Sequence, residues 1–168
     1  MLSQTVATNT TINYPGIADI MCHSATLFWL YTDEFRSSPS LDVFTSRALM
    51  PPAPLIRSML RLGSQVKNAS SLSRLAAGTV IVFVSNGEPM HSCVALPGNR
   101  IGGFNQTGWY TTNGIGGRYS AHNMTEVQWF TEFMNKNEVR GSNDQMRCKL
   151  IAIPENSAKA IVRQAIQK

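Results

Sequence analysis

Cys22 and His91 are residue types that can act together, as a thiol nucleophile and the base that takes its proton. Cys22 lies three residues after Asp19, where a helix is expected to begin. A helix N-terminus carries unpaired N–H groups and a partial positive charge, and both stabilise a thiolate. A nearby imidazole would lower the thiol pKa further. Alternatively, Cys22 is a small buried apolar residue, as cysteines often are.

The three histidines differ in their surroundings. His91 lies in an apolar segment, MHSCVAL, where it could be either a base or a hydrogen-bonded core residue. His23 adjoins Cys22, but neighbours on a helix point about 100° apart, so His23 is not expected to be the base. His122 lies in a polar stretch and is expected to be solvated.

Asn105 is the candidate for a third member of the site, with Gln106 as the fallback. Both end a predicted strand that folds back beside the strand of His91. An amide at this place could orient one imidazole nitrogen, as the third member of a triad does. Alternatively, residues 105–108 form a simple turn.

Neither a metal nor a cofactor is expected. His91 and Cys93 share one face of a strand, but no CxxC or HxxxH spacing supplies further ligands. No GxxxxGK[ST] phosphate loop occurs. Cys148 opens an apolar strand and is expected in the core. Because three cysteines are an odd count, at least one thiol is free or pairs with another chain.

The 168 residues predict a 1–15 flexible lead and a single domain over 16–168. Apolar residues make up 43% of the chain, and the net charge of +5 includes no run of five like charges. Nucleic acid is therefore not the expected partner. The competing interpretation is a binding module whose aromatic, basic loop at 107–119, with Trp109, Tyr110 and Arg118, holds nucleic acid or another anion.

The N-terminus lacks the basic start and apolar run of a signal peptide, and no apolar stretch of 18 residues occurs. No membrane partner is expected. The sequence predicts a protein that is cytoplasmic in the producing cell, and that would be secreted or injected only by a route without a cleaved signal.

Hydrophobic periodicity predicts an α+β domain with an antiparallel meander. The expected helices cover residues 19–35, 41–49, 55–67, 124–134 and 157–167, the last capped by Asn156. The expected strands cover residues 79–85, 90–96, 100–105 and 147–153, with turns at Asn86-Gly87 and Pro97-Gly98-Asn99. Residues 107–122 are expected to form a loop. In the third helix, Ile56, Met59, Leu60 and Leu62 are expected to face inward.

The order of these features resembles the core of papain-like cysteine hydrolases of the NlpC type. Cys22 opens a buried helix, a GTVIVF strand follows, and HSCVAL, a Pro-Gly-Asn turn and RIGGFNQTG come in succession. The likeness covers residues 16–107. Three positions depart from the family: His23-Ser24 stand where Ser-Gly is usual, Gly78-Thr79 where Gly-Asp is usual, and Asn105 where His is usual.

The resemblance implies a papain-like fold in which N-terminal helices pack on a small antiparallel sheet. It implies hydrolysis of an amide bond by Cys22, with His91 as base and acid and Asn105 orienting the ring. The backbone N–H of Cys22, with Asn13 or Tyr14, would bind the oxyanion. The implied substrate is a protein or peptidoglycan, and the departures favour a bacterial effector or toxin that acts as a peptidase, amidase or glutamine deamidase.

Overall fold

The structure is a computed structural model, and it describes residues 22–35, 52–66, 74–85, 87–98, 100–104, 119–123 and 148–167. The expected helices over 41–49 and 124–134 and the flexible lead over 1–15 lie outside these residues.

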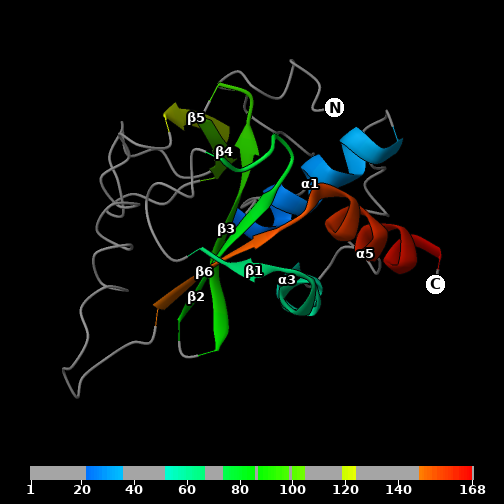
Figure 1. Ribbon diagram of the computed structural model, residues 1–168. Coiled ribbons are helices and arrows are strands. Elements are labelled where there is room, and N and C mark those ends of the chain that lie inside the picture. Colours follow the sequence, from blue (N-terminus) through cyan, green and yellow to red (C-terminus); the bar gives the residue numbers. More distant parts are fainter. Residues whose placement is uncertain are drawn as a thin grey trace.

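The described strands form one sheet of six, in the order β1-β6-β2-β3-β4-β5. They are β1 (Ser64–Gln65), β2 (Val80–Ser85), β3 (Glu88–Leu96), β4 (Arg100–Phe104), β5 (Tyr119–Asn123) and β6 (Cys148–Ile153). Every pair of neighbours is antiparallel. The predicted α+β class and the meander of β2, β3 and β4 are therefore confirmed (Figure 1).

Glycines make the two tight turns of the meander possible. Gly87 between β2 and β3 has φ +80°, and Gly98 between β3 and β4 has φ +79°. Glycine adopts this left-handed backbone at little cost, whereas other residues are strained there. The turn predictions at Asn86-Gly87 and Pro97-Gly98-Asn99 agree with these positions.

Helices α1 (Cys22–Phe35), α3 (Pro52–Met59) and α5 (Glu155–Gln167) pack on one face of the sheet (Figure 1). Their apolar side chains share a core with alternate residues of β2 and β3. The members from the two strands are Val80, Val82, Val84, Val94 and Leu96. Since strand residues alternate between faces, this pattern fixes which side of the sheet the helices cover.

Helix α1 is buried on most sides, as its composition predicted. Leu27, Trp29 and Leu30 are at most 1% exposed. Polar residues of α1 are buried as well, including His23, Thr26 and Asp33. Buried polar groups are costly without hydrogen bonds, so the partners of these side chains matter for both stability and function.

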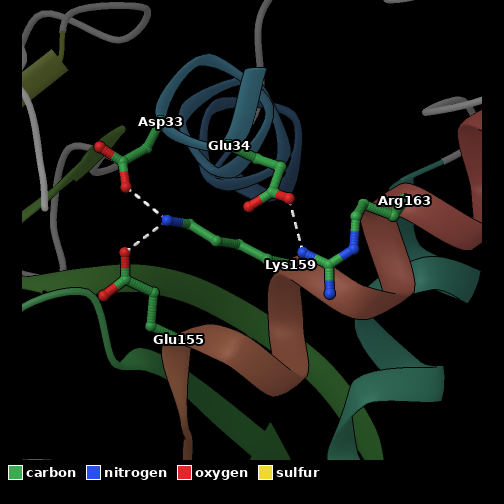
Figure 2. Close-up of polar contacts among 5 residues, drawn as sticks. All are labelled: Asp33, Glu34, Glu155, Lys159 and Arg163. Carbon is green, nitrogen blue, oxygen red and sulfur yellow. Dashed lines mark hydrogen bonds and ion pairs between the residues drawn. The ribbon is translucent and has the colours of Figure 1, made fainter. Parts of the chain in front are cut away.

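Ion pairs join α1 to α5. Lys159 Nζ lies 2.5 Å from Asp33 Oδ2 and 2.6 Å from Glu155 Oε1 (Figure 2). Arg163 Nη1 lies 2.5 Å from Glu34 Oε1. The first and last described helices of the chain are therefore tied side by side.

The boundaries predicted for the third helix, 55–67, are wrong. Helix α3 begins at Pro52, because the first N–H groups of a helix have no intrahelical partner and proline loses nothing there. It ends at Met59, and a 3₁₀ turn over Leu60–Leu62 leads into β1. Gly63 has an extended backbone, and a Cβ there would lie 2.5 Å from Ile151 Cγ2, so the chain passes close to β6 at this residue.

The prediction that four apolar side chains of this segment face the core is also wrong in part. Ile56 and Met59 are fully buried, but Leu62 is 40% exposed. Leu60 is half-buried against the core. The change from α-helix to 3₁₀ turn rotates the last side chains away from the inward face.

Two further boundaries differ from the sequence prediction. Helix α5 begins at Glu155 rather than after Asn156, because the Ala158 N–H already donates to the Pro154 carbonyl at 3.0 Å. The expected loop over 107–122 contains a strand, β5, which pairs with β4 from Tyr119 to Asn123. His122 therefore lies in this strand, opposite Ile101.

Candidate functional site

Cys22 is the first described residue of α1 and is 9% exposed. Burial raises the pKa of its thiol, although backbone N–H groups of Ser92, His23 and Cys22 itself act in the opposite direction. The sulfur is therefore a neutral thiol at neutral pH, held where backbone donors favour negative charge. Such a thiol needs a base before it can act as a nucleophile.

The neighbouring His23 fixes the start of α1 on β3. Its Nδ1 lies 2.8 Å from Ser92 Oγ, and its Nε2 lies 3.0 Å from the Pro89 carbonyl oxygen. Ser92 Oγ lies a further 3.0 Å from Thr26 Oγ1. Thr26 is one helical turn beyond Cys22, and its Oγ1 lies 3.1 Å from the Cys22 carbonyl oxygen. A continuous polar chain thus runs from β3 to the first turn of α1.

His91 is buried in β3 and pairs across the sheet with Phe83 of β2. The two ring centroids are 5.3 Å apart, with 49° between the ring planes. Ser92, the next residue, faces α1, and its cross-strand partner Val82 belongs to the core beneath the helices. Because side chains alternate along a strand, His91 leaves the backbone toward the other face of the sheet.

The structure brings the segments of Cys22 and His91 together. His23, next to Cys22, binds Pro89 and Ser92, and these two residues lie on either side of His91 in β3. A shift in the pairing of β2 with β3 at Phe83/Val84 lies in the same segment. Such bulges re-aim side chains and are common beside functional sites.

The remaining candidates of the catalytic site fall outside the residues that the structure describes. These are Asn105, Gln106, Asn13 and Tyr14. The same holds for Trp109, Tyr110 and Arg118 of the aromatic loop. Their predicted roles stay predictions.

Cys93 is completely buried in β3. Burial raises the pKa of its thiol strongly, and the nearby Cys22 sulfur raises it further. Neither cysteine forms a disulfide. The backbone of Cys148 begins β6. Within the described ranges, no group of three or more His, Cys, Asp or Glu side chains is placed to hold a metal ion.

Sequence reasoning missed the role of His23, together with its partners Thr26, Pro89 and Ser92. A signal was present: His23 and Thr26 are three apart, so they share a face of an otherwise apolar helix. Two polar residues on a buried helix face need hydrogen-bond partners from another element. The sequence could not say that Ser92 and Pro89 supply them.

Comparisons with protein families, with curated proteins and with solved structures find no match for this chain. Among the described helices, none is both long and apolar enough to cross a membrane.

Proposed function

We propose that this protein is a papain-like cysteine hydrolase that cleaves an amide bond with Cys22 as nucleophile and His91 as base. One observation supports the proposal above the others. The first turn of α1, which carries Cys22, is hydrogen-bonded to the residues that flank His91 in β3. Two segments 69 positions apart in the chain, one with the thiol and the other with the imidazole, are therefore tied to each other through His23 and Ser92.

The arrangement of elements also agrees with a papain-like fold. A helix that begins at Cys22 packs on β3 and β4 of an antiparallel sheet. The histidine strand follows the GTVIVF strand directly, as the resemblance requires. Asn105 comes directly after β4, the strand next to that of His91, where the third residue of such a site is expected.

The chemistry follows from the state of the thiol. Because burial keeps Cys22 protonated, His91 takes the proton as the sulfur bonds to the carbonyl carbon of the substrate. The resulting imidazolium gives its proton to the leaving nitrogen, and the C–N bond breaks. Water then attacks the thioester, releases the acid and restores the thiol. Backbone N–H groups near the sulfur stabilise the negative charge that develops during the first step.

The proposal leaves three substrate classes to be separated by experiment. Cleavage of a peptide bond releases a new amine, deamidation of a glutamine side chain releases ammonia, and cleavage of a peptidoglycan stem releases shortened muropeptides. The departures from the cell-wall pattern at His23-Ser24 and Asn105 favour a protein substrate and a role as a bacterial effector or toxin.

The test is an activity assay on a host-cell extract, with separate detection of new amines and of ammonia, and on purified peptidoglycan. We expect Cys22→Ala and His91→Gln to lower the rate by at least about a thousandfold while circular dichroism stays unchanged. His122→Gln in β5 is the matched histidine control and should keep full activity. Full activity in folded Cys22→Ala or His91→Gln would overturn the proposal.

Thiol labelling gives a second test that needs no substrate. If His91 draws the proton from Cys22, iodoacetamide should modify Cys22 at pH 7 faster than Cys93, and His91→Gln should slow labelling of Cys22 at least tenfold. Mass spectrometry of peptides separates the cysteines. An unchanged labelling rate in His91→Gln would show that His91 does not act on this thiol.

A further inference from the structure

Polar side chains connect the first turn of α1 with β3 in an unbroken chain. From one end to the other it runs through the Cys22 carbonyl, Thr26, Ser92, His23 and the Pro89 carbonyl. Its four contacts are between 2.8 and 3.1 Å, which is hydrogen-bond distance for each pair of atoms. The chain belongs to neither of the two catalytic roles proposed above.

Counting the hydrogens of this chain constrains the state of His23. The two ends are carbonyl oxygens, which only accept, and each hydroxyl has one hydrogen to donate. Thr26 and Ser92 therefore supply two hydrogens for four contacts. A neutral imidazole adds one, which satisfies three contacts, and an imidazolium adds two, which satisfies all four.

The carbonyl of Cys22 is the end that can best do without its side-chain donor. It is also the i−4 acceptor for the Thr26 backbone N–H in helix α1. In the most favourable neutral arrangement, the one contact left without a hydrogen is therefore that between Thr26 and the Cys22 carbonyl. The ring proton is then on Nε2, which donates to the Pro89 carbonyl. In the structure Ser92 Oγ donates to Thr26 Oγ1 and Thr26 Oγ1 donates to the Cys22 carbonyl. In the neutral arrangement both hydroxyls turn, so that Ser92 donates to Nδ1 and Thr26 donates to Ser92.

We propose that His23, neutral and protonated at Nε2, is the positioning residue that holds Cys22 against β3, and that a second ring proton reverses the hydrogen bonds back to the Cys22 carbonyl. This inference deepens the proposed function and rests on it. In the reversed chain His23 donates to Ser92, Ser92 to Thr26, and Thr26 to the Cys22 carbonyl. The imidazolium then adds a positive charge beside the thiol.

The surroundings of His23 favour the neutral form. Burial lowers its pKa, and the Pro89 carbonyl offsets this in part. On its own helix the adjacent titratable group is Cys22, and on β3 the titratable groups are Glu88, His91 and Cys93. Glu88 is exposed and forms an ion pair with Arg57 of α3. Asp33 and Glu34 lie about three turns away on α1, where they pair with Lys159 and Arg163 of α5.

The sign of the pH effect follows from that shift. The ordinary pKa of a histidine is 6.5, and that of folded His23 is lower. The stabilising contribution of neutral His23 is therefore complete above pH 6.5 and is lost as the pH falls through the lowered value.

The first experiment is a long-range ¹H–¹⁵N NMR titration of the wild-type protein. The chain has three histidines, so His23→Gln assigns the His23 signals by their loss. We expect the Nε2–H tautomer at pH 7.5 and a midpoint below pH 6.5. The Nδ1–H tautomer, or a midpoint above pH 6.5, would overturn the inference.

The second experiment tests whether His23 positions Cys22 in its neutral form or in its protonated form. A glutamine amide carries a donor and an acceptor but cannot be protonated, so His23→Gln should keep the hydrolysis rate within about threefold at pH 7.5 and lose its dependence on pH below 6.5. His23→Leu removes both functions. It should lower kcat at least tenfold with KM unchanged, and speed the labelling of Cys22 by iodoacetamide at least threefold.

Ser92→Ala removes the partner of Nδ1 and should lower kcat in the same direction as His23→Leu. Ser58→Ala, which deletes a hydroxyl bonded to the Leu55 carbonyl in α3, is the matched serine control and should change neither readout. An unchanged labelling rate of Cys22 in folded His23→Leu would show that His23 does not position the thiol. A protein that hydrolyses no amide but shows the expected tautomer and labelling would refute the proposed function and leave the positioning of the thiol standing.

Discussion

Lys159 Nζ lies 2.5 Å from Asp33 Oδ2, and this contact joins the last helix to the first across 126 positions of the chain. Both side chains are less than 10% exposed. Glu155 completes the cluster one turn before Lys159 on α5 (Figure 2). Because α1 begins with Cys22, the cluster fixes the far end of the helix that carries the proposed nucleophile.

Removing the lysine should destabilise the protein strongly. Lys159→Met leaves the Asp33 and Glu155 carboxylates close together without their shared cation, and breaking a buried pair in this way costs about 3–5 kcal/mol. Urea unfolding measures the loss. Arg163→Met is the matched control, because the Arg163 side chain is 42% exposed and its pair with Glu34 should contribute less than about 1 kcal/mol. An equal loss of unfolding free energy in the two variants would show that the buried cluster contributes no more to stability than the exposed ion pair.

The same cluster predicts a pH dependence. Burial acts to raise the pKa of Asp33, but the hydrogen bonds with Lys159 and Glu155 and the positive charge of Lys159 together outweigh it and hold the pKa below the ordinary 3.8. The stabilisation from Asp33 is then complete above pH 3.8 and is lost as the pH falls through the lowered value. The difference in unfolding free energy between the wild type and Asp33→Asn should shrink from pH 5 to about pH 2. A constant difference over this range would contradict the assignment.

At alkaline pH the lysine gives the complementary behaviour. Burial acts to lower the pKa of Lys159, but Asp33 and Glu155 raise it above the ordinary 10.5. Its contribution is complete below pH 10.5 and is lost only as the pH rises through the raised value. No loss from this cluster is therefore expected between about pH 5 and pH 9.

Gly78 should not tolerate a side chain. Its φ is +95°, and a Cβ there would overlap the Glu155 carboxyl group. Gly78→Ala should cost about 1–2 kcal/mol for the backbone strain alone, and more for the displaced carboxylate. Thermal and urea unfolding measure the total.

Gly87 provides the control for this prediction. Its φ of +80° is similar, but a Cβ there would meet no atom within 4 Å. Gly87→Ala should therefore show the strain without the overlap. If Gly78→Ala lowers the free energy of unfolding no more than Gly87→Ala, the contact between Glu155 and Gly78, just before β2, does not limit the size of the residue at position 78.

Local sequence determined several elements of this fold. The β-branched run TVIVFVS made β2 a strand buried on both faces, and Gly87 and Gly98 set the turns on either side of β3 because their backbones need positive φ. The apolar composition of 19–35 predicted a buried helix, and α1 is one. Each of these features depends on neighbours within a few positions.

Helix ends were less accessible to sequence reasoning. The sequence predicts that the third helix begins at residue 55, yet α3 contains Pro52 and Pro54 in its first turn, where missing N–H groups cost nothing. The strand β5 follows a glycine-rich stretch and has no strong β signal of its own, and it pairs antiparallel with β4. Tertiary pairing decided the second outcome, whereas the first is a local property of helix starts.

The sequence by itself determined that a thiol stands at the start of a buried helix and that an imidazole stands in an apolar strand. Only the tertiary structure decided that His23 and Ser92, 69 positions apart, would bond to each other and set that helix on that strand. The physical reason is that a buried polar group takes whichever partner packing brings within about 3 Å. The positions of these residues in the sequence therefore do not predict which partner each of them binds.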